Sequence, residues 1–426
     1  MTPAIISLIV LVVCIVLFIT RVIPNAVTAV LGCLLLALTG VCSLDKAFSG
    51  FSNSTVLLMF GMMVVGIAMM DTGVAKIIGK LVSKAAAGSE KMFILMAGLA
   101  SILLSTFLSN TAVISIFLPI IASVAQSNSN MNRKNLTLPV TLGAMFGGVC
   151  TLVGSTPQLT ANGILSEMTG QELKMFDFLL PGIIICAVYL VFVLTVGHKI
   201  GNRVWGLQID DVIQTDLQTS TVEEDFEIKK TKIVIMMIIF SLTIVLFIGG
   251  WISTAMTAVI AALLCVITGC TTYKSVIKNM DWSVVFILAG CLGIAAGLTS
   301  GGAGELMSDA LSKVISADIT PIIVFAIFVL TTMIISNFIT NSTAVVIVLP
   351  IALAFCSSFG FQPIPFSLGI VYAANLTFST PLANAQTAMT LVAGYKFSDY
   401  IRYTWLLDIL VFIAIIVSVP IFFPLV

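Results

Sequence analysis

A polar motif with long apolar flanks occurs twice in this chain. Ser105-Thr-Phe-Leu-Ser109-Asn110-Thr111 leads into an apolar arm that ends at Pro119, and Ser336-Asn-Phe-Ile-Thr340-Asn341-Ser342 leads into one that ends at Pro350. Between residues 105–120 and 336–351, seven of sixteen positions are identical. Both copies place hydroxyl and amide side chains inside hydrophobic surroundings. Paired polar interruptions in the two halves of a membrane protein are typical of a transporter's binding site.

The composition fixes the class of protein. Of the 426 residues, 59% are hydrophobic and only 9% are charged, which is more apolar surface than a soluble fold can bury. The sequence therefore predicts an all-α polytopic membrane protein in a lipid bilayer. With a net charge of zero, no nucleic acid partner is expected. A single histidine and the absence of clustered carboxylates in the apolar runs argue against a zinc or di-iron enzyme.

Two further motifs repeat in the same order as the first. The stretch from Thr28 to Gly40 matches the stretch from Thr257 to Gly269 at seven of thirteen positions. Ser155-Thr-Pro recurs as Ser379-Thr-Pro. The three offsets are 229, 231 and 224 residues, so duplication explains them better than chance. We expect a first repeat over residues 1–197, a hydrophilic linker over 198–230 and a second repeat over 231–426.

Each repeat is predicted to hold five transmembrane helices, one of them broken, together with an interfacial helix and a re-entrant hairpin. The runs 92–108 and 111–126 meet at the first polar motif with no loop between them, as two helices would if they folded back at a buried tip. Lysines at positions 76, 80 and 84 give residues 74–87 the pattern of a helix lying in the membrane interface, and residues 304–316 are its counterpart.

Five spans is an odd number, so the two repeats should be inverted relative to each other. With both termini outside and the central linker in the cytoplasm, sixteen lysines and arginines lie inside and three lie outside. This bias follows the positive-inside rule and supports both the orientation and the hairpins. The expected location is the inner, or plasma, membrane.

The broken helices are predicted where proline and polar residues interrupt apolar runs. Gly154-Ser-Thr-Pro157 interrupts residues 136–168, and Phe378-Ser-Thr-Pro381 interrupts residues 365–394. Unwound backbone at membrane depth survives only where protein or a water-filled cavity satisfies its polar groups. Each hairpin tip is therefore expected to face the broken helix of its own half.

Such an arrangement offers ligands of two kinds. Free carbonyl groups with serine and asparagine oxygens suit a hard cation such as Na⁺, and free N–H groups at helix ends suit an anion. The amides of Asn110 and Asn341 serve both purposes, since they donate and accept. The hydroxyls that could donate to an anion's carboxylates belong to Ser109, Thr111, Thr156, Thr340, Ser342 and Thr380.

Each motif on its own has a plainer explanation. A single Ser-Asn-Thr in a membrane protein is most often a turn or a helix-packing cluster, and a single Ser-Thr-Pro is most often a kink. The duplicated set in matched order favours a ligand site. Asp71 and Asp408 are placed near the ends of their spans, so no carboxylate is expected deep in one, and Na⁺ coupling is favoured over proton coupling.

At these residues the chain resembles the divalent anion/sodium symporter family, over about residues 1–424. The resemblance implies two inverted repeats, a homodimer, an elevator motion, and import of dicarboxylates, citrate or sulfate with Na⁺. It implies one sodium at Ser105, Asn110 and the Gly154-Ser155 backbone, and the other at Ser336, Asn341 and the Phe378-Ser379 backbone. The substrate contacts it implies are Asn110, Thr111, Asn341 and Ser342, with Ser155, Thr156 and Thr380 beside them.

The chain also departs from the family pattern. The family's broken helices typically carry Gly-Thr-Pro-Pro-Asn, whereas the first break here reads Gly154-Ser-Thr-Pro-Gln158, and Phe378 stands where the family often has a small residue. The second tip reads Thr340-Asn341-Ser342 in place of Ser-Asn-Thr. The identity of the substrate and the second sodium site depend on these positions.

The favoured function is a secondary transporter that couples Na⁺ to uptake of a small divalent anion, with C4-dicarboxylates such as succinate, malate and fumarate first. Sulfate or citrate uptake, or arsenite-type efflux, are alternatives within the same superfamily. An intramembrane enzyme would need buried carboxylates, a histidine pair or an activated nucleophile, and the predicted spans supply none. A passive channel is a third class, which duplicated tips able to close around a ligand disfavour.

Overall fold

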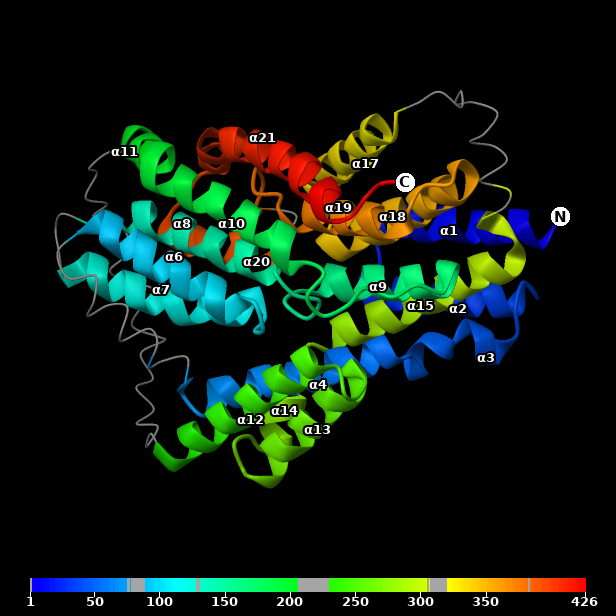
Figure 1. Ribbon diagram of the computed structural model, residues 1–426, viewed down its shortest axis with the longest axis horizontal. Coiled ribbons are helices and arrows are strands. Elements are labelled where there is room, and N and C mark those ends of the chain that lie inside the picture. The colour runs from blue at the N-terminus through cyan, green and yellow to red at the C-terminus, as the bar shows by residue number, and fades with distance from the viewer. Residues whose placement is uncertain are drawn as a thin grey trace.

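The protein is a bundle of helices in the computed structural model (Figure 1). The structure describes residues 2–74, 77, 89–127, 131–205, 230–304, 306, 320–381 and 384–426, and these contain helices, turns and loops but no strand. Seven helices among them are long and apolar enough to cross a membrane: Pro3–Thr20, Ser54–Asp71, Leu179–Trp205, Lys230–Gly249, Trp282–Gly301, Asn341–Phe359 and Phe397–Phe422. The predicted class, an all-α multi-pass membrane protein, is confirmed.

The first half of the chain contains helices of 4 to 18 residues. In chain order they are α1 (Pro3–Thr20), α2 (Asn25–Leu38), α3 (Leu44–Ala47), η1 (Ser49–Ser52), α4 (Ser54–Asp71), α6 (Glu90–Ser105), α7 (Asn110–Ser127), α8 (Arg133–Gly148), α9 (Thr156–Thr169), α10 (Leu179–Phe192), the π-helix η2 (Val193–Gly197) and α11 (His198–Trp205). The last three form one continuous helix.

The second half follows a similar order. Its helices are α12 (Lys230–Gly249), α13 (Thr254–Ile267), α14 (Tyr273–Asn279), α15 (Trp282–Gly301), α17 (Pro321–Ser336), α18 (Asn341–Phe359), α19 (Pro363–Asn375), α20 (Ala385–Met389), η3 (Thr390–Ala393) and α21 (Phe397–Phe422). The predicted interfacial helices, 74–87 and 304–316, fall mostly outside the described residues.

One group of helices is held together by two closely packed helix pairs, each joining the two halves of the chain. α4 packs on α13, and α2 packs on α15. A Cβ atom at Gly61 would lie 2.6 Å from the Ala258 carbonyl oxygen, and one at Gly290 would lie 2.6 Å from the Ala29 Cβ. Both the glycines and the alanines are 229 residues apart in sequence. Small residues at these crossings let the helix backbones approach closely, which is how membrane helices gain van der Waals contact.

A second group of helices surrounds the two polar motifs. α6 and α7 pack on α8, α17 and α18 pack on α19, and α10 packs along α21. α9 contacts both α15 of the first group and α18 of the second. Figure 1 shows α9 between α18 and α15, near the centre of the molecule.

The helix that ends the first half continues beyond the expected linker boundary at residue 197. α11 extends it to Trp205, because this eight-residue segment has an apolar side that packs on the second half. The Trp205 ring stacks on Tyr403 with centroids 5.1 Å apart and meets Tyr395 edge-on at 5.2 Å. Residues 206–229, the rest of the expected linker, lie outside the described residues.

The glycine at the α4–α13 crossing gives a test of this packing. Gly61→Ala should destabilise the protein by about 1–3 kcal/mol, because the added methyl group meets backbone that cannot move aside. The measurement is thermal unfolding in detergent. Gly66→Ala, on the same helix, is the control, since its Cβ would meet nothing closer than 3.7 Å. Equal melting temperatures for the two variants would contradict the close crossing.

Candidate functional site

The first polar motif, here called the first tip, lies between the end of α6 and the start of α7. The fully buried Ser105 donates a hydrogen bond of 2.5 Å to Oδ1 of Asn110, which is itself 5% exposed. The asparagine amide rests on the last residue of α8, since a Cβ at Gly148 would lie 2.1 Å from its Oδ1. Glycine at the end of α8 therefore leaves the space that the Asn110 side chain fills.

The second tip repeats this arrangement between α17 and α18. The hydroxyl of the buried Ser336 lies 3.2 Å from Oδ1 of Asn341 and 2.7 Å from the carbonyl oxygen of Ala374, which belongs to α19. In both tips a serine thus hydrogen-bonds the asparagine that follows five residues later and begins the next helix.

The first predicted break is present between α8 and α9. The stretch 149–155 is not helical, and within it the hydroxyl of Thr151 donates to the carbonyl oxygen of Thr106 in the first tip, at 2.5 Å. Gly154 is packed so tightly that a Cβ there would lie 2.2 Å from the carbonyl oxygen of Gly148. The first tip therefore contacts the break of its own half.

The second break follows α19 and precedes α20. Here the buried Thr380 donates its hydroxyl proton to the carbonyl oxygen of Asn337 in the second tip. Asn384 donates to the carbonyl oxygen of Thr377 at 3.1 Å and so closes part of the unwound segment on itself. As in the first half, a threonine of the break satisfies a carbonyl group of the tip.

The two halves also meet directly through site residues. Ser342, in the first turn of α18, donates to the hydroxyl of Thr156 at 3.1 Å. Ser155 lies 2.8 Å from Oδ1 of Asn375, the last residue of α19. The first break therefore contacts polar groups from both halves.

Two residues at this junction were not predicted as site residues. Gln158 accepts from Asn375 at 3.2 Å and from Ser155, and it donates to the carbonyl oxygen of Gly148 at 2.6 Å. Both amides are buried. Their signal in the sequence is a polar amide inside an apolar run, which indicates a buried hydrogen-bond network.

The other predicted hydroxyl groups either lie against a residue close by in the sequence or point away from the tips. The exposed Ser109 lies 3.4 Å from the Thr111 hydroxyl, and Thr340 lies 2.6 Å from that of Thr343. The side chain of Ser379 does not face the tip. Its hydroxyl donates to the carboxylate of Asp408 on α21.

The expectation that no carboxylate lies deep in a span is wrong. Asp408 lies in the middle third of α21, because that helix begins at Phe397, before the apolar run that defined the predicted span. Thr404 also donates to its Oδ2, at 3.4 Å, while its Oδ1 is buried without a hydrogen-bond partner. Asp71 is at the end of α4, as predicted, and accepts from Thr271 at 2.6 Å.

The helix starts at this site keep backbone donors available. Neither Ser155 nor Thr340 caps the helix that follows it with its side chain, so the first-turn N–H groups of α9 and α18 have no such partner. Both helices exceed twelve residues, and their N-terminal ends carry partial positive charge. The hydrogen bond between Ser342 and Thr156 brings the two ends together.

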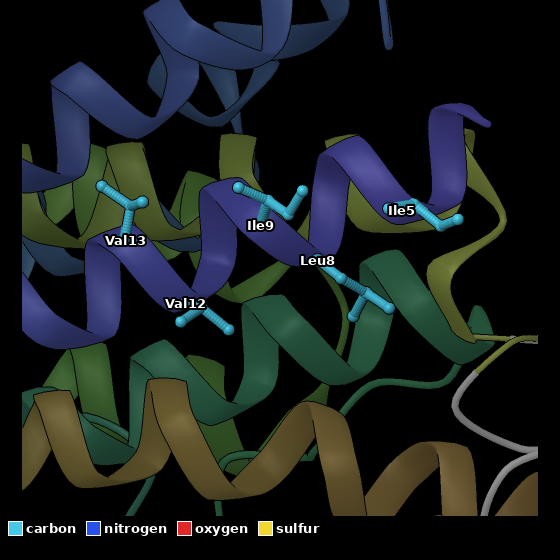
Figure 2. A pocket seen from close by; sticks show the side chains of 5 residues that line it. All are labelled: Ile5, Leu8, Ile9, Val12 and Val13. Carbon is cyan, nitrogen blue, oxygen red and sulfur yellow. The ribbon is translucent and has the colours of Figure 1, made fainter. Parts of the chain in front are cut away.

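A surface pocket on α1, in contrast to the polar candidate site, is lined by apolar side chains. Figure 2 shows its lining, Ile5, Leu8, Ile9, Val12 and Val13, all on α1. None of these side chains has a group that binds an ion or a carboxylate, and such an apolar helix face suits lipid acyl chains.

Comparison with known proteins identifies the family. The sequence pattern of the citrate transporter family matches residues 15–337. The chain belongs to the citrate transporter family. This family and the relatives described next are transporters. The finding agrees with the resemblance of this chain to sodium-coupled anion symporters.

Two curated relatives match most of the chain. An uncharacterized transporter of Haemophilus influenzae is 25% identical over 424 residues, which cover 94% of this chain and 88% of the relative. The sodium-dependent dicarboxylate transporter SdcS of Staphylococcus aureus is 23% identical over 418 residues, covering 88% and 78% of the two chains.

A solved structure shares the fold. The YdaH transporter of Alcanivorax borkumensis superposes with a TM-score of 0.67 at 12% identity, over 99% of this chain and 98% of the other. At that identity the likeness concerns the arrangement of helices.

The amide at the centre of the junction can be tested by its effect on stability. Gln158→Leu should destabilise the protein by about 1–3 kcal/mol for each buried partner left unpaired, since the carbonyl of Gly148 and the amide of Asn375 both lose a hydrogen bond. Thermal unfolding in detergent measures this loss. Gln171→Leu makes the same change at an exposed position and should leave the melting temperature almost unchanged.

Proposed function

We propose that this protein is a secondary active transporter that couples Na⁺ entry to uptake of a small divalent anion, with C4-dicarboxylates such as succinate, malate and fumarate as its substrates. The proposal rests on one observation, which is that a pair of a serine and an asparagine occurs twice. Each pair lies at a tip, and each tip contacts the break in its own half of the chain. The relative SdcS, a sodium-dependent dicarboxylate transporter, supports the choice of ion and substrate.

The sodium ions would bind where each tip meets its break. Ser105, Asn110 and the backbone at Gly154-Ser155 are the proposed ligands of one ion, and Ser336 and Asn341 with the backbone at Phe378-Ser379 those of the other. The contacts of both asparagines support this, because each amide oxygen already sits against a serine hydroxyl. Hydroxyl, amide and carbonyl oxygens at a buried point are the ligands that a hard cation prefers.

The anion would bind between the two tips. Its carboxylates would meet the first-turn N–H groups of α9 and α18, whose starts are joined by the bond between Thr156 and Ser342. Partial positive charge at helix starts favours an anion without a fixed cation beside it. Hydroxyl and amide donors would complete the site: Ser109, Asn110, Thr111, Ser155, Thr156, Thr340, Asn341, Ser342 and Thr380.

The proposed architecture is two inverted repeats, each with a re-entrant hairpin made by α6 and α7 or by α17 and α18. The similar order of helices and the reciprocal packing of α2 on α15 and α4 on α13 support it. Figure 1 shows α11 at the left end of the molecule, the N-terminus at the right end and the C-terminus on the right of its middle. We propose that both termini lie outside and that the linker is cytoplasmic. The plasma membrane is the proposed location.

The mechanism we propose is an elevator motion in a homodimer, as the resemblance to the symporter family implies. In it, the helix group around the tips would move against the group built on the α4–α13 and α2–α15 crossings. The small residues at those crossings support a rigid group there, because close backbone contact resists sliding.

Citrate is a second candidate substrate, favoured by the description of the family that matches residues 15–337. Citrate has one carboxylate more than succinate, so it would need an additional donor at the same site. Competition separates the two candidates, because excess unlabelled citrate should inhibit succinate uptake only if both bind there.

The decisive experiment is uptake of radiolabelled succinate into proteoliposomes under an inward Na⁺ gradient, repeated with K⁺ in place of Na⁺. We expect accumulation with Na⁺ and none with K⁺, because the anion site is completed only when cations occupy the tips. Uptake that is equal with both ions would contradict the coupling. Absence of uptake from folded protein would rule out C4-dicarboxylates and move the screen to citrate, sulfate and arsenite.

The two tip asparagines should be essential for transport. Asn110→Ala and Asn341→Ala should each reduce Na⁺-driven uptake to background, since each removes an amide that serves the cation and the anion together. The measurement is initial uptake rate at equal amounts of folded protein. Asn279→Ala is the matched control, because Asn279 is exposed on α14 and its side chain, within the part of the chain that the structure describes, bonds Ser275 alone, at 3.1 Å. Normal rates in either tip variant would contradict the site.

A further inference from the structure

A carboxylate on α21 contacts the second break through the side chain of Ser379. Asp408 of α21 accepts hydrogen bonds from the hydroxyls of Ser379 and Thr404, and the backbone of Phe378 also interacts with its carboxylate. The hydroxyls of Ser379 and Thr404 are themselves 3.2 Å apart. We call Ser379, Thr404 and Asp408 the carboxylate cluster.

The cluster has acceptor capacity that the protein does not use. Oδ1 of Asp408 is buried and has no hydrogen-bond partner, although a carboxylate oxygen at membrane depth is costly to leave unpaired. Among the described residues, no lysine, arginine or histidine forms an ion pair with Asp408. A bound cation would supply both the missing contact and the missing charge.

The atoms of the cluster select the kind of cation. Its side-chain groups offer oxygen only, which suits a hard ion and disfavours zinc or copper. It contains one carboxylate, so a monovalent ion leaves it neutral, whereas a divalent ion would leave net positive charge inside the membrane. Sodium is the monovalent hard cation that the proposed function already requires.

We infer that the carboxylate cluster of Ser379, Thr404 and Asp408 binds a Na⁺ ion of its own, distinct from the two tip sites. This inference rests on the proposed Na⁺ coupling and adds a site to it. The cluster is separate from the second tip, because Ser336 and Asn341 hydrogen-bond each other beside the Ala374 carbonyl, whereas the Ser379 hydroxyl turns toward α21.

The position of the cluster would let this ion act on the transport site. Ser379 and Thr380 are adjacent, and Thr380 donates to the tip carbonyl of Asn337. An ion at Asp408 fixes Ser379 and thereby the neighbouring backbone of the break. Sodium binding at α21 would therefore order the segment that the second tip contacts.

The test is equilibrium binding of radiolabelled Na⁺ to the full chain in detergent, by scintillation proximity, with no substrate present. Asp408→Asn should lower the number of Na⁺ ions bound per chain by one while the tip sites remain. Thr404→Val, which keeps the charge, should weaken binding at this site by about tenfold, as the loss of one ligand does. Asp71→Asn is the matched control, because Asp71 also accepts from a threonine hydroxyl and has no unpartnered buried oxygen.

Each outcome has a definite meaning. An unchanged number of bound ions in Asp408→Asn overturns the inference but leaves the two tip sites, and Na⁺-driven uptake by the wild type would still support the proposed function. If Asp408→Asn does not fold, as judged by its melting curve in K⁺, unchanged Na⁺ affinity in Thr404→Val overturns the inference in its place. A wild-type chain that binds no Na⁺ overturns the inference and the coupling together.

Discussion

The structure depends on one constraint, which is that polar backbone groups inside a membrane must find partners within the protein. The chain stops being helical at 149–155 and again after Asn375, and each time a threonine hydroxyl donates to a carbonyl group of a tip. In each half, the break thus satisfies a backbone carbonyl group of the tip. The same pairing gathers the asparagines, serines and helix starts at one place, so satisfying the backbone also builds the candidate site.

The packing around this centre follows from residue size. Where helices of different halves cross, at Gly61 on Ala258 and at Gly290 on Ala29, only small residues allow the approach. At the first tip, Gly148 makes room for an amide in place of a helix backbone. Small residues therefore have two effects. They let helix pairs pack closely in one region, and they leave room for the side chain of Asn110 in another.

Much of this arrangement could be predicted from the sequence, because the motifs carry their own physical meaning. The Ser105 and Ser336 motifs located both tips, and proline after Ser-Thr located both breaks, since proline removes a helical donor. In the sequence, Gln158 stands out only as a departure from a family pattern. Its partner Asn375 comes from the other half of the chain, and no local pattern reveals a contact across 217 residues.

The misplacement of Asp408 has a different cause. An apolar run marks where side chains are hydrophobic, but α21 begins earlier, with Asp399 and Arg402 in its first turns, so the run underestimates its length. The direction of the Ser379 side chain was also beyond prediction. In an unwound segment, the backbone and the side chain of one residue can contact different neighbours. The sequence does not indicate which neighbour the side chain contacts.

The hydrogen bonds that join the halves have a consequence for the transport cycle. In the structure, Ser342 bonds Thr156, Ser155 bonds Asn375, and the serines of both tips bond their asparagines. A symporter must return across the membrane empty after releasing its cargo, and naked polar groups would make that step slow. In the symporter that we propose, bonds of this kind would let the polar groups of the candidate site satisfy one another during the empty return, and so would lower the desolvation cost of that step.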